Sequence, residues 1–106
     1  MKAILIYITC KDLAEAKHIA RNLVQEKLIA CANILGPVNA VYEWEDKICE
    51  EEEYAMLLKA SASKYEAVET KIKSLHSYDT PCIIQLPIER GNACYLDWIA
   101  KQLSLT

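Results

Sequence analysis

Apolar and β-branched residues occupy both odd and even positions of the run from Ala3 to Thr9. Alternate side chains of a strand point to opposite faces, so a run of this kind is typical of a central strand buried on both sides. A helical pattern follows, in which Asp12 and Glu15 stand at the positions of an N-terminal capping box. Its apolar residues recur at helical spacing and are Leu13, Ala16, Ala20, Leu23, Val24 and Leu28.

The rest of the chain repeats strand and helix patterns. The Gly36-Pro37 pair predicts a bend or bulge within a long second strand, and the polar residues 45–47 predict a hairpin turn. Pro87 predicts an edge position for the fourth strand. The remaining predicted elements are a strand over 30–44, a strand ending at 58, a helix beginning at Ser63, a strand over 82–88 and a final helix over 95–103.

This order of elements predicts an α+β fold of the ferredoxin-like βαββαβ type with an additional C-terminal helix. Right-handed crossovers turn the order into a four-stranded antiparallel sheet with two helices on one face. A length of 106 residues fits a single domain, 1–106. The other sheet face lacks a full cover and 53% of the residues are hydrophobic, so we expect copies of the chain to associate.

Charge and composition exclude several classes of protein. The net charge of −3 gives no basic face for nucleic acid. No run of eighteen apolar residues predicts a membrane span, and the start of the chain lacks the features of a signal peptide, so we expect a cytoplasmic protein. The five cysteines are odd in number and none forms a CxxC pair, which argues against a disulfide framework or a zinc knuckle. No nucleophile or phosphate-binding motif is present, so we do not expect an enzyme.

Five segments resemble the CutA divalent-cation tolerance family in order and spacing. They are residues 23–33 with their Ala-Cys-x-Asn strand entry, Tyr42-Glu-Trp-Glu-Asp-Lys47, Leu58-Lys59, His76-Ser-Tyr-Asp-Thr-Pro81 and Tyr95-Leu-Asp-Trp-Ile99. Asp46 replaces the usual glycine of the family, Ser77 a proline, and Cys82 a glutamate.

The resemblance implies a homotrimer similar to the PII-type signalling proteins. It also implies a link to copper or another divalent cation, and no established catalysis. In some family members a cysteine near the end of strand one and histidines of the His-x-Tyr loop are assigned to copper. Here that strand position is Ile8, Cys10 lies two residues further on, and Leu75 precedes His76 where a second histidine would stand.

The predicted topology decides which candidate residues can meet. Strand one ends near Cys10 and the second helix ends at His76, at the same end of the sheet. Cys31 opens the second strand at the opposite end, where the third strand reaches Lys59. A Cys10–His76 pair is therefore allowed within one chain, whereas Cys31 with His76 requires a second subunit.

The two groups of residues carry different hypotheses. Cys10 and His76 offer a thiolate and an imidazole, which suit copper or zinc, although two ligands make a weak site. The alternatives are a strand-end thiol without function and a histidine favoured by the helix dipole.

A second group, Cys31, Trp44, Lys59 and Tyr78, predicts a cleft between subunits that holds an anionic small molecule or a peptide. Trp44 is alternatively an interface anchor, and Tyr7, Tyr65, Tyr95 and Trp98 are predicted to lie in the core.

Three functions remain open at this point. The leading hypothesis is a cytoplasmic trimer associated with divalent-cation, and especially copper, tolerance. The first alternative is a PII-like regulatory module that binds a small molecule or a protein partner of unknown identity. The second is a purely structural oligomer.

Overall fold

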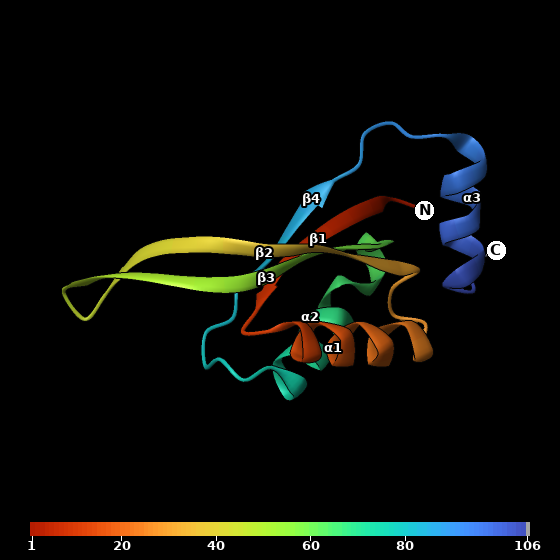
Figure 1. Ribbon diagram of the computed structural model, residues 1–106. Coiled ribbons are helices and arrows are strands. Elements are labelled where there is room, and N and C mark those ends of the chain that lie inside the picture. The colour runs from red at the N-terminus through yellow and green to blue at the C-terminus, as the bar shows by residue number, and fades with distance from the viewer. Residues whose placement is uncertain (106) are drawn as a thin grey trace.

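A computed structural model describes residues 1–105 of the chain as one four-stranded sheet with three helices (Figure 1). The strand order is β2-β3-β1-β4, and every neighbouring pair is antiparallel. This arrangement confirms the predicted βαββαβ order and the additional C-terminal helix. The elements are β1 (Ala3–Cys10), α1 (Leu13–Gln25), β2 (Cys31–Trp44), β3 (Lys47–Ser61), a 3₁₀ turn (Ala62–Lys64), α2 (Tyr65–Leu75), β4 (Ile83–Pro87) and α3 (Ala93–Gln102).

The core lies between the sheet and helices α1 and α2. Ile4, Ile6 and Ile8 of the central strand β1 are fully buried on the helix side. Leu5 and Tyr7 alternate with them and are only half-buried, so β1 is central but its second face is partly open, contrary to the prediction. The helix side chains that close this core are Ala16, Ile19, Leu23, Val68 and Ile72.

Helix α1 begins and ends with specific hydrogen bonds. The Asp12 carboxylate accepts a hydrogen bond from the Glu15 amide at 2.8 Å, which confirms Asp12 as the N-cap. The capping box is incomplete, because the Glu15 carboxylate accepts a hydrogen bond from the Lys11 amide, at 3.0 Å, and not from the amide of Asp12. At the other end Lys27 has φ of 57°, and the amides of Lys27 and Leu28 close a Schellman motif.

The start of α2 differs from the prediction. The helix was expected to begin at Ser63, but the Ser61 hydroxyl accepts from the Ser63 amide, and α2 begins only at Tyr65 without a side-chain cap. The reason is that β3 continues to Ser61, so a 3₁₀ turn must reverse the chain before the helix starts. Strand β4 lies at a sheet edge as predicted, but it is one residue shorter at each end than the predicted strand over 82–88.

The β2–β3 hairpin projects beyond the sheet as a two-stranded ribbon (Figure 1). Pairing between β1 and β3 stops at Cys10 with Tyr54, so residues 38–44 and 47–53 pair only with each other. The ribbon makes the molecule 48 Å long. The predicted bulge is confirmed by a register shift between Ile34 and Gly36, where Gly36 has φ of 101°.

The sheet face away from α1 and α2 is open and apolar. Strand pairing places Leu5, Tyr7, Leu57, Ile84 and Leu86 together on it, because directly paired residues share a face.

Helix α3 stands beside one end of this face and contributes Ile99 and Leu103 to a small separate cluster with Ala30. Tyr95 and Trp98 were predicted to be core residues, but they are 41% and 39% exposed, because nothing within residues 1–105 covers the outer side of α3. Tyr7 and Tyr65 are half-buried. No helix within residues 1–105 is long and apolar enough to cross a membrane.

Candidate functional site

Three side chains that can ligate a metal meet where β1 ends, α1 begins and α2 ends. The ligand atoms of Cys10, Glu15 and His76 all lie within 4.8 Å of one another. Cys10 is fully buried, as is the His76 side chain, and the Glu15 side chain is 7% exposed. The fold thus places Cys10 and His76 at one end of the sheet and adds Glu15 to them.

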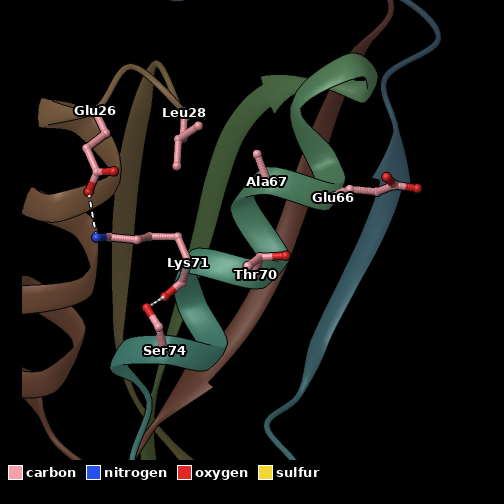
Figure 2. A pocket seen from close by; sticks show the side chains of 7 residues that line it. All are labelled: Glu26, Leu28, Glu66, Ala67, Thr70, Lys71 and Ser74. Carbon is pink, nitrogen blue, oxygen red and sulfur yellow. Dashed lines mark hydrogen bonds and ion pairs between the residues drawn. The ribbon is translucent and has the colours of Figure 1, made fainter.

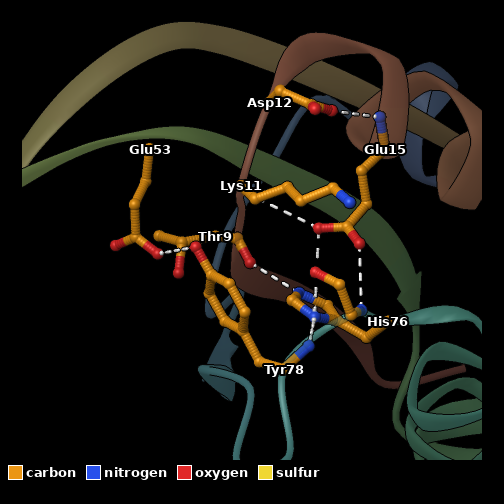
Figure 3. Close-up of polar contacts among 8 residues, drawn as sticks. Thr9, Lys11, Asp12, Glu15, Glu53, His76 and Tyr78 are labelled. Atoms are coloured by element: carbon orange, nitrogen blue, oxygen red, sulfur yellow. Dashed lines mark hydrogen bonds and ion pairs between the residues drawn. The ribbon is translucent and has the colours of Figure 1, made fainter.

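Both ring nitrogens of His76 have hydrogen-bond partners (Figure 3). The Nδ1 atom accepts from the Tyr78 amide at 3.1 Å, so Nε2 carries the proton and donates to the Thr9 carbonyl at 2.8 Å. His76 is therefore a neutral imidazole that connects the end of α2 to the end of β1. Its Nδ1 lies 4.0 Å from a Glu15 carboxylate oxygen.

Glu15 joins the start of α1 to the loop after α2. One oxygen accepts from the Lys11 amide at 3.0 Å and the other from the Ser77 amide at 2.9 Å. Burial raises the pKa of the Glu15 carboxyl, but the hydrogen bonds from Lys11 and Ser77 outweigh burial and lower it below 4.5. Glu15 is thus an ionised carboxylate at neutral pH.

The Cys10 thiol is protonated in this environment. Burial raises its pKa to about 12, and the charges of Glu15, Asp12 and Glu53 raise it in the same direction. No buried side-chain nitrogen or oxygen within residues 1–105 lacks a hydrogen-bond partner. A metal ion at this cluster must therefore displace the thiol proton and compete with existing hydrogen bonds.

A groove of about 560 Å³ lies next to the cluster, between the ribbon and the loop after α2. Tyr78 links the two places: its amide bonds to His76, and its hydroxyl donates to Glu53 at 2.7 Å (Figure 3). Local sequence patterns do not predict this groove, because its walls come from the ribbon and from the distant loop after α2. Its lining residues are Thr9, Tyr42, Trp44, Cys49, Glu51, Glu53, Tyr78, Asp79, Thr80 and Cys82.

The predicted cleft residues are divided between the two ends of the sheet. Trp44 and Tyr78 line the groove, whereas Cys31 pairs with Lys59 in the β2–β3 ladder at the opposite end. There the Cys31 sulfur lies 3.4 Å from the Tyr95 hydroxyl, and Lys59 donates to the Asn33 side chain. Within one chain the four residues do not form one cleft.

A second hollow, of about 490 Å³, lies between α1 and α2 (Figure 2). The Lys71 ammonium crosses it to the Glu26 carboxylate at 2.8 Å, and the Ser74 hydroxyl donates to the Lys71 carbonyl at 2.6 Å. None of its lining residues belongs to the cluster around His76.

The family model described as the CutA1 divalent ion tolerance protein matches residues 4–102. The chain belongs to the CutA1 family. The divalent-cation tolerance protein CutA of Archaeoglobus fulgidus is 47% identical over 94 residues, which are 89% of this chain and 91% of that protein. The human protein CutA is 38% identical over 95 residues, 90% of this chain but only 53% of the human protein. The chain thus spans about half of the human relative's length.

Solved CutA structures have the same fold. The structure described as the periplasmic divalent cation tolerance protein CutA from Archaeoglobus fulgidus superposes with a TM-score of 0.93 at 44% identity, covering 95% of this chain and 98% of that one. CutA from Xylella fastidiosa gives a TM-score of 0.94 at 36% identity, covering 97% and 99%.

The three departures from the family pattern have visible consequences. Ser77 donates a backbone hydrogen bond to Glu15 that a proline could not make. Asp46 keeps the two-residue hairpin turn, because Glu45 and Asp46 both adopt positive φ, of 50° and 63°. Cys82 lines the groove, where burial and then the charge of Glu53 raise its thiol pKa.

Sequence reasoning missed Glu15 as a member of the cluster. Its spacing from Asp12 indicated a helix cap, which is a local role. The available signal was its position in the first turn of the helix that follows Cys10, since that turn must lie at the same end of the sheet as His76.

Proposed function

We propose that this CutA1 family member supports divalent-cation tolerance as a non-enzymatic homotrimer that binds copper or another divalent cation directly. The observation that carries the proposal is the convergence of Cys10, Glu15 and His76, with ligand atoms within 4.8 Å. A thiolate and an imidazole favour copper or zinc over calcium or magnesium. Three protein ligands leave one position of a tetrahedral ion open.

Binding at this cluster has a structural consequence. The Nδ1 lone pair of His76 now accepts from the Tyr78 amide, and one lone pair cannot serve both that amide and a metal. A cation at Nδ1 therefore releases the Tyr78 amide. Because the Tyr78 hydroxyl also donates to Glu53, a cation that binds the cluster and releases the Tyr78 amide should also affect the wall of the groove.

The proposed trimer rests on two features of the isolated chain. An unsupported two-stranded ribbon is marginally stable in water, and the ribbon face opposite the groove exposes Val41 and Ile48. The open sheet face adds the exposed residues Ile84 and Leu86. Association with other copies covers both surfaces, and the number three comes from the family resemblance. Sedimentation equilibrium measures it: three chains per particle supports the proposal, and a stable folded monomer contradicts it.

Titration of reduced protein with Co²⁺, Zn²⁺ and Cu²⁺ under anaerobic conditions tests direct binding. We expect one ion per chain, a thiolate-to-cobalt absorption band, and tighter binding as the pH rises, since the Cys10 proton must leave. Cys10→Ser should abolish the band, whereas Cys94→Ser, at an exposed cysteine outside the cluster, should retain it. Equal binding by both variants would exclude this site.

The cytoplasmic location is part of the same proposal. The Archaeoglobus relative's structure is described as periplasmic, so the two proteins would differ in compartment. Cell fractionation with antibodies to the native protein tests this: we expect the protein in the cytoplasmic fraction, and its recovery from a periplasmic fraction would contradict the proposal.

A second candidate is a PII-like regulatory module that binds a small molecule. The observation in its favour is the groove, in which Tyr42, Trp44 and Tyr78 provide aromatic walls beside several polar groups. A thermal-shift screen against metabolites tests it: a hit whose effect is lost in Trp44→Ala supports the module, and no shift with any class of metabolite argues against it.

A further inference from the structure

The groove beside the ribbon is strongly acidic. Its three carboxylates are Glu51, Glu53 and Asp79, and among residues 1–105 no basic side chain lines it. Neighbouring groups respond to this charge. Burial and the Glu53 carboxylate raise the pKa of Tyr78, and burial and the Glu51 carboxylate raise that of Tyr42. An anionic ligand is therefore disfavoured here, and a cation is favoured.

The arrangement of the carboxylates argues against a metal ion in the groove. In the described part of the chain, the one cluster of three metal-ligating side chains is Cys10, Glu15 and His76, which is not in the groove. Glu51 and Glu53 are two positions apart on one strand, so their Cα atoms are separated by roughly 6.6 Å along it. Charges spaced in this way suit a ligand that carries two separate cationic groups.

The aromatic residues supply the apolar part of the site. Tyr42 and Trp44 lie on the same strand face of β2 and line the groove, with Tyr78 contributed by the loop after α2. The faces of such rings attract ammonium groups and pack well against methylene chains. Aromatic walls together with spaced carboxylates therefore match a linear organic cation better than a hydrated ion.

We propose that this groove binds an aliphatic diamine or polyamine, with ammonium groups at Glu51 and Glu53 and the methylene chain against Tyr42 and Trp44. The inference rests on the second candidate function and specifies its ligand class. It differs from the anionic ligand expected from the sequence, because Lys59 lies at the other end of the sheet and leaves the groove without a positive charge.

Spermidine is the probe for this site, and the chain contains a convenient reporter. Of its two tryptophans, Trp44 lines the groove and Trp98 lies on α3, so Trp98→Phe leaves Trp44 as the single tryptophan, which is excited selectively at wavelengths that tyrosine does not absorb. We expect a saturable change of Trp44 fluorescence with spermidine. Calorimetry on the unsubstituted protein should give the same affinity. Agreement between the two values would show that Trp98→Phe leaves the groove folded as in the native chain.

A matched pair of double variants tests the placement of the charges. Glu51→Gln with Glu53→Gln removes two charges from the groove, whereas Glu50→Gln with Glu52→Gln removes two from the opposite face of the same strand. The first pair should weaken spermidine binding about tenfold, as expected for two partly exposed ion pairs. The second pair should retain the affinity to within about twofold.

Three results would overturn this inference in distinguishable ways. Equal loss of affinity in both double variants would show non-specific attraction to the net charge. If spermidine does not bind but an anionic or neutral metabolite shifts the melting temperature through Trp44, the ligand class is wrong and the second candidate function stands. If neither binds, both the ligand class and that function fail.

Discussion

The His76 ring donates from Nε2 to the Thr9 carbonyl at 2.8 Å and so fastens the end of α2 to the end of β1. These residues are 67 positions apart in the sequence. The same ring accepts from the Tyr78 amide, which fixes the first turn of the following loop. One buried imidazole therefore satisfies a strand-end acceptor and a loop donor.

Substitution of His76 by alanine should destabilise the protein. It leaves the Thr9 carbonyl and the Tyr78 amide without their partner, which we expect to lower the free energy of unfolding by about 2–3 kcal/mol. Urea unfolding at fixed protein concentration measures the loss. His18→Ala is the matched control, because His18 is exposed on α1 and should change the stability little. Similar losses in both variants would contradict the connecting role.

Substitution of Ser77 by proline, the residue typical of the family at this position, should remove the backbone hydrogen bond to Glu15. We expect a loss of about 1–2 kcal/mol in the free energy of unfolding, because the acceptor is a buried carboxylate. Ser77→Ala keeps the amide and removes only the side-chain hydrogen bond to Glu15, so it should lose less stability than the proline variant. The idea is wrong if the alanine variant loses as much stability as the proline variant.

Glu15 should make the stability depend on pH. Its folded-state pKa is lowered, so its contribution is fully present above its ordinary value of 4.5 and is lost as the pH falls through the lower folded value. Glu15→Gln should therefore reduce stability at pH 7 and flatten its decline below pH 4.5. Chemical unfolding across this pH range measures both effects, with Glu50→Gln as an exposed control. An unchanged slope in Glu15→Gln would count against this assignment.

Asp46→Gly should stabilise the hairpin. Asp46 has φ of 63°, a conformation that costs an L-residue about 1 kcal/mol and glycine almost nothing. We expect the free energy of unfolding to rise by about that amount. Glu43→Gly, in the extended strand before the turn, should have the opposite sign. If Asp46→Gly destabilises the protein, the aspartate side chain has a role in the turn beyond its backbone.

Periodicity was sufficient to predict the order of elements, and Pro87 indicated the edge position of β4. It did not show which face of β1 meets the helices, because apolar residues occupy both faces of that strand. The end of the sheet shared by Cys10 and His76 was also predictable, because strand and helix directions follow from that order alone. In contrast, the sequence could not tell whether Ser61 or Ser63 caps the turn before α2. Both serines carry the same local signal, and the outcome depends on how far β3 extends.

Long-range contacts account for what the sequence did not reveal. The bond from Ser77 to Glu15 joins residues 62 positions apart, and the groove forms only because the projecting ribbon brings Glu51 beside the loop after α2. The apolar pattern of Tyr95 and Trp98 predicted burial, but both side chains are exposed, because periodicity does not tell whether the same chain covers an apolar helix face.

The most direct measurement of the central claim is the position of a bound cation. Crystals grown with Zn²⁺ or Co²⁺ and measured at the metal absorption edge locate the ion by anomalous scattering. The account predicts one peak per chain about 2.0–2.3 Å from the Cys10 sulfur, a Glu15 oxygen and the His76 Nδ1 atom, with the Tyr78 amide displaced. Peaks confined to other residues, with the His76–Tyr78 hydrogen bond intact, would contradict it.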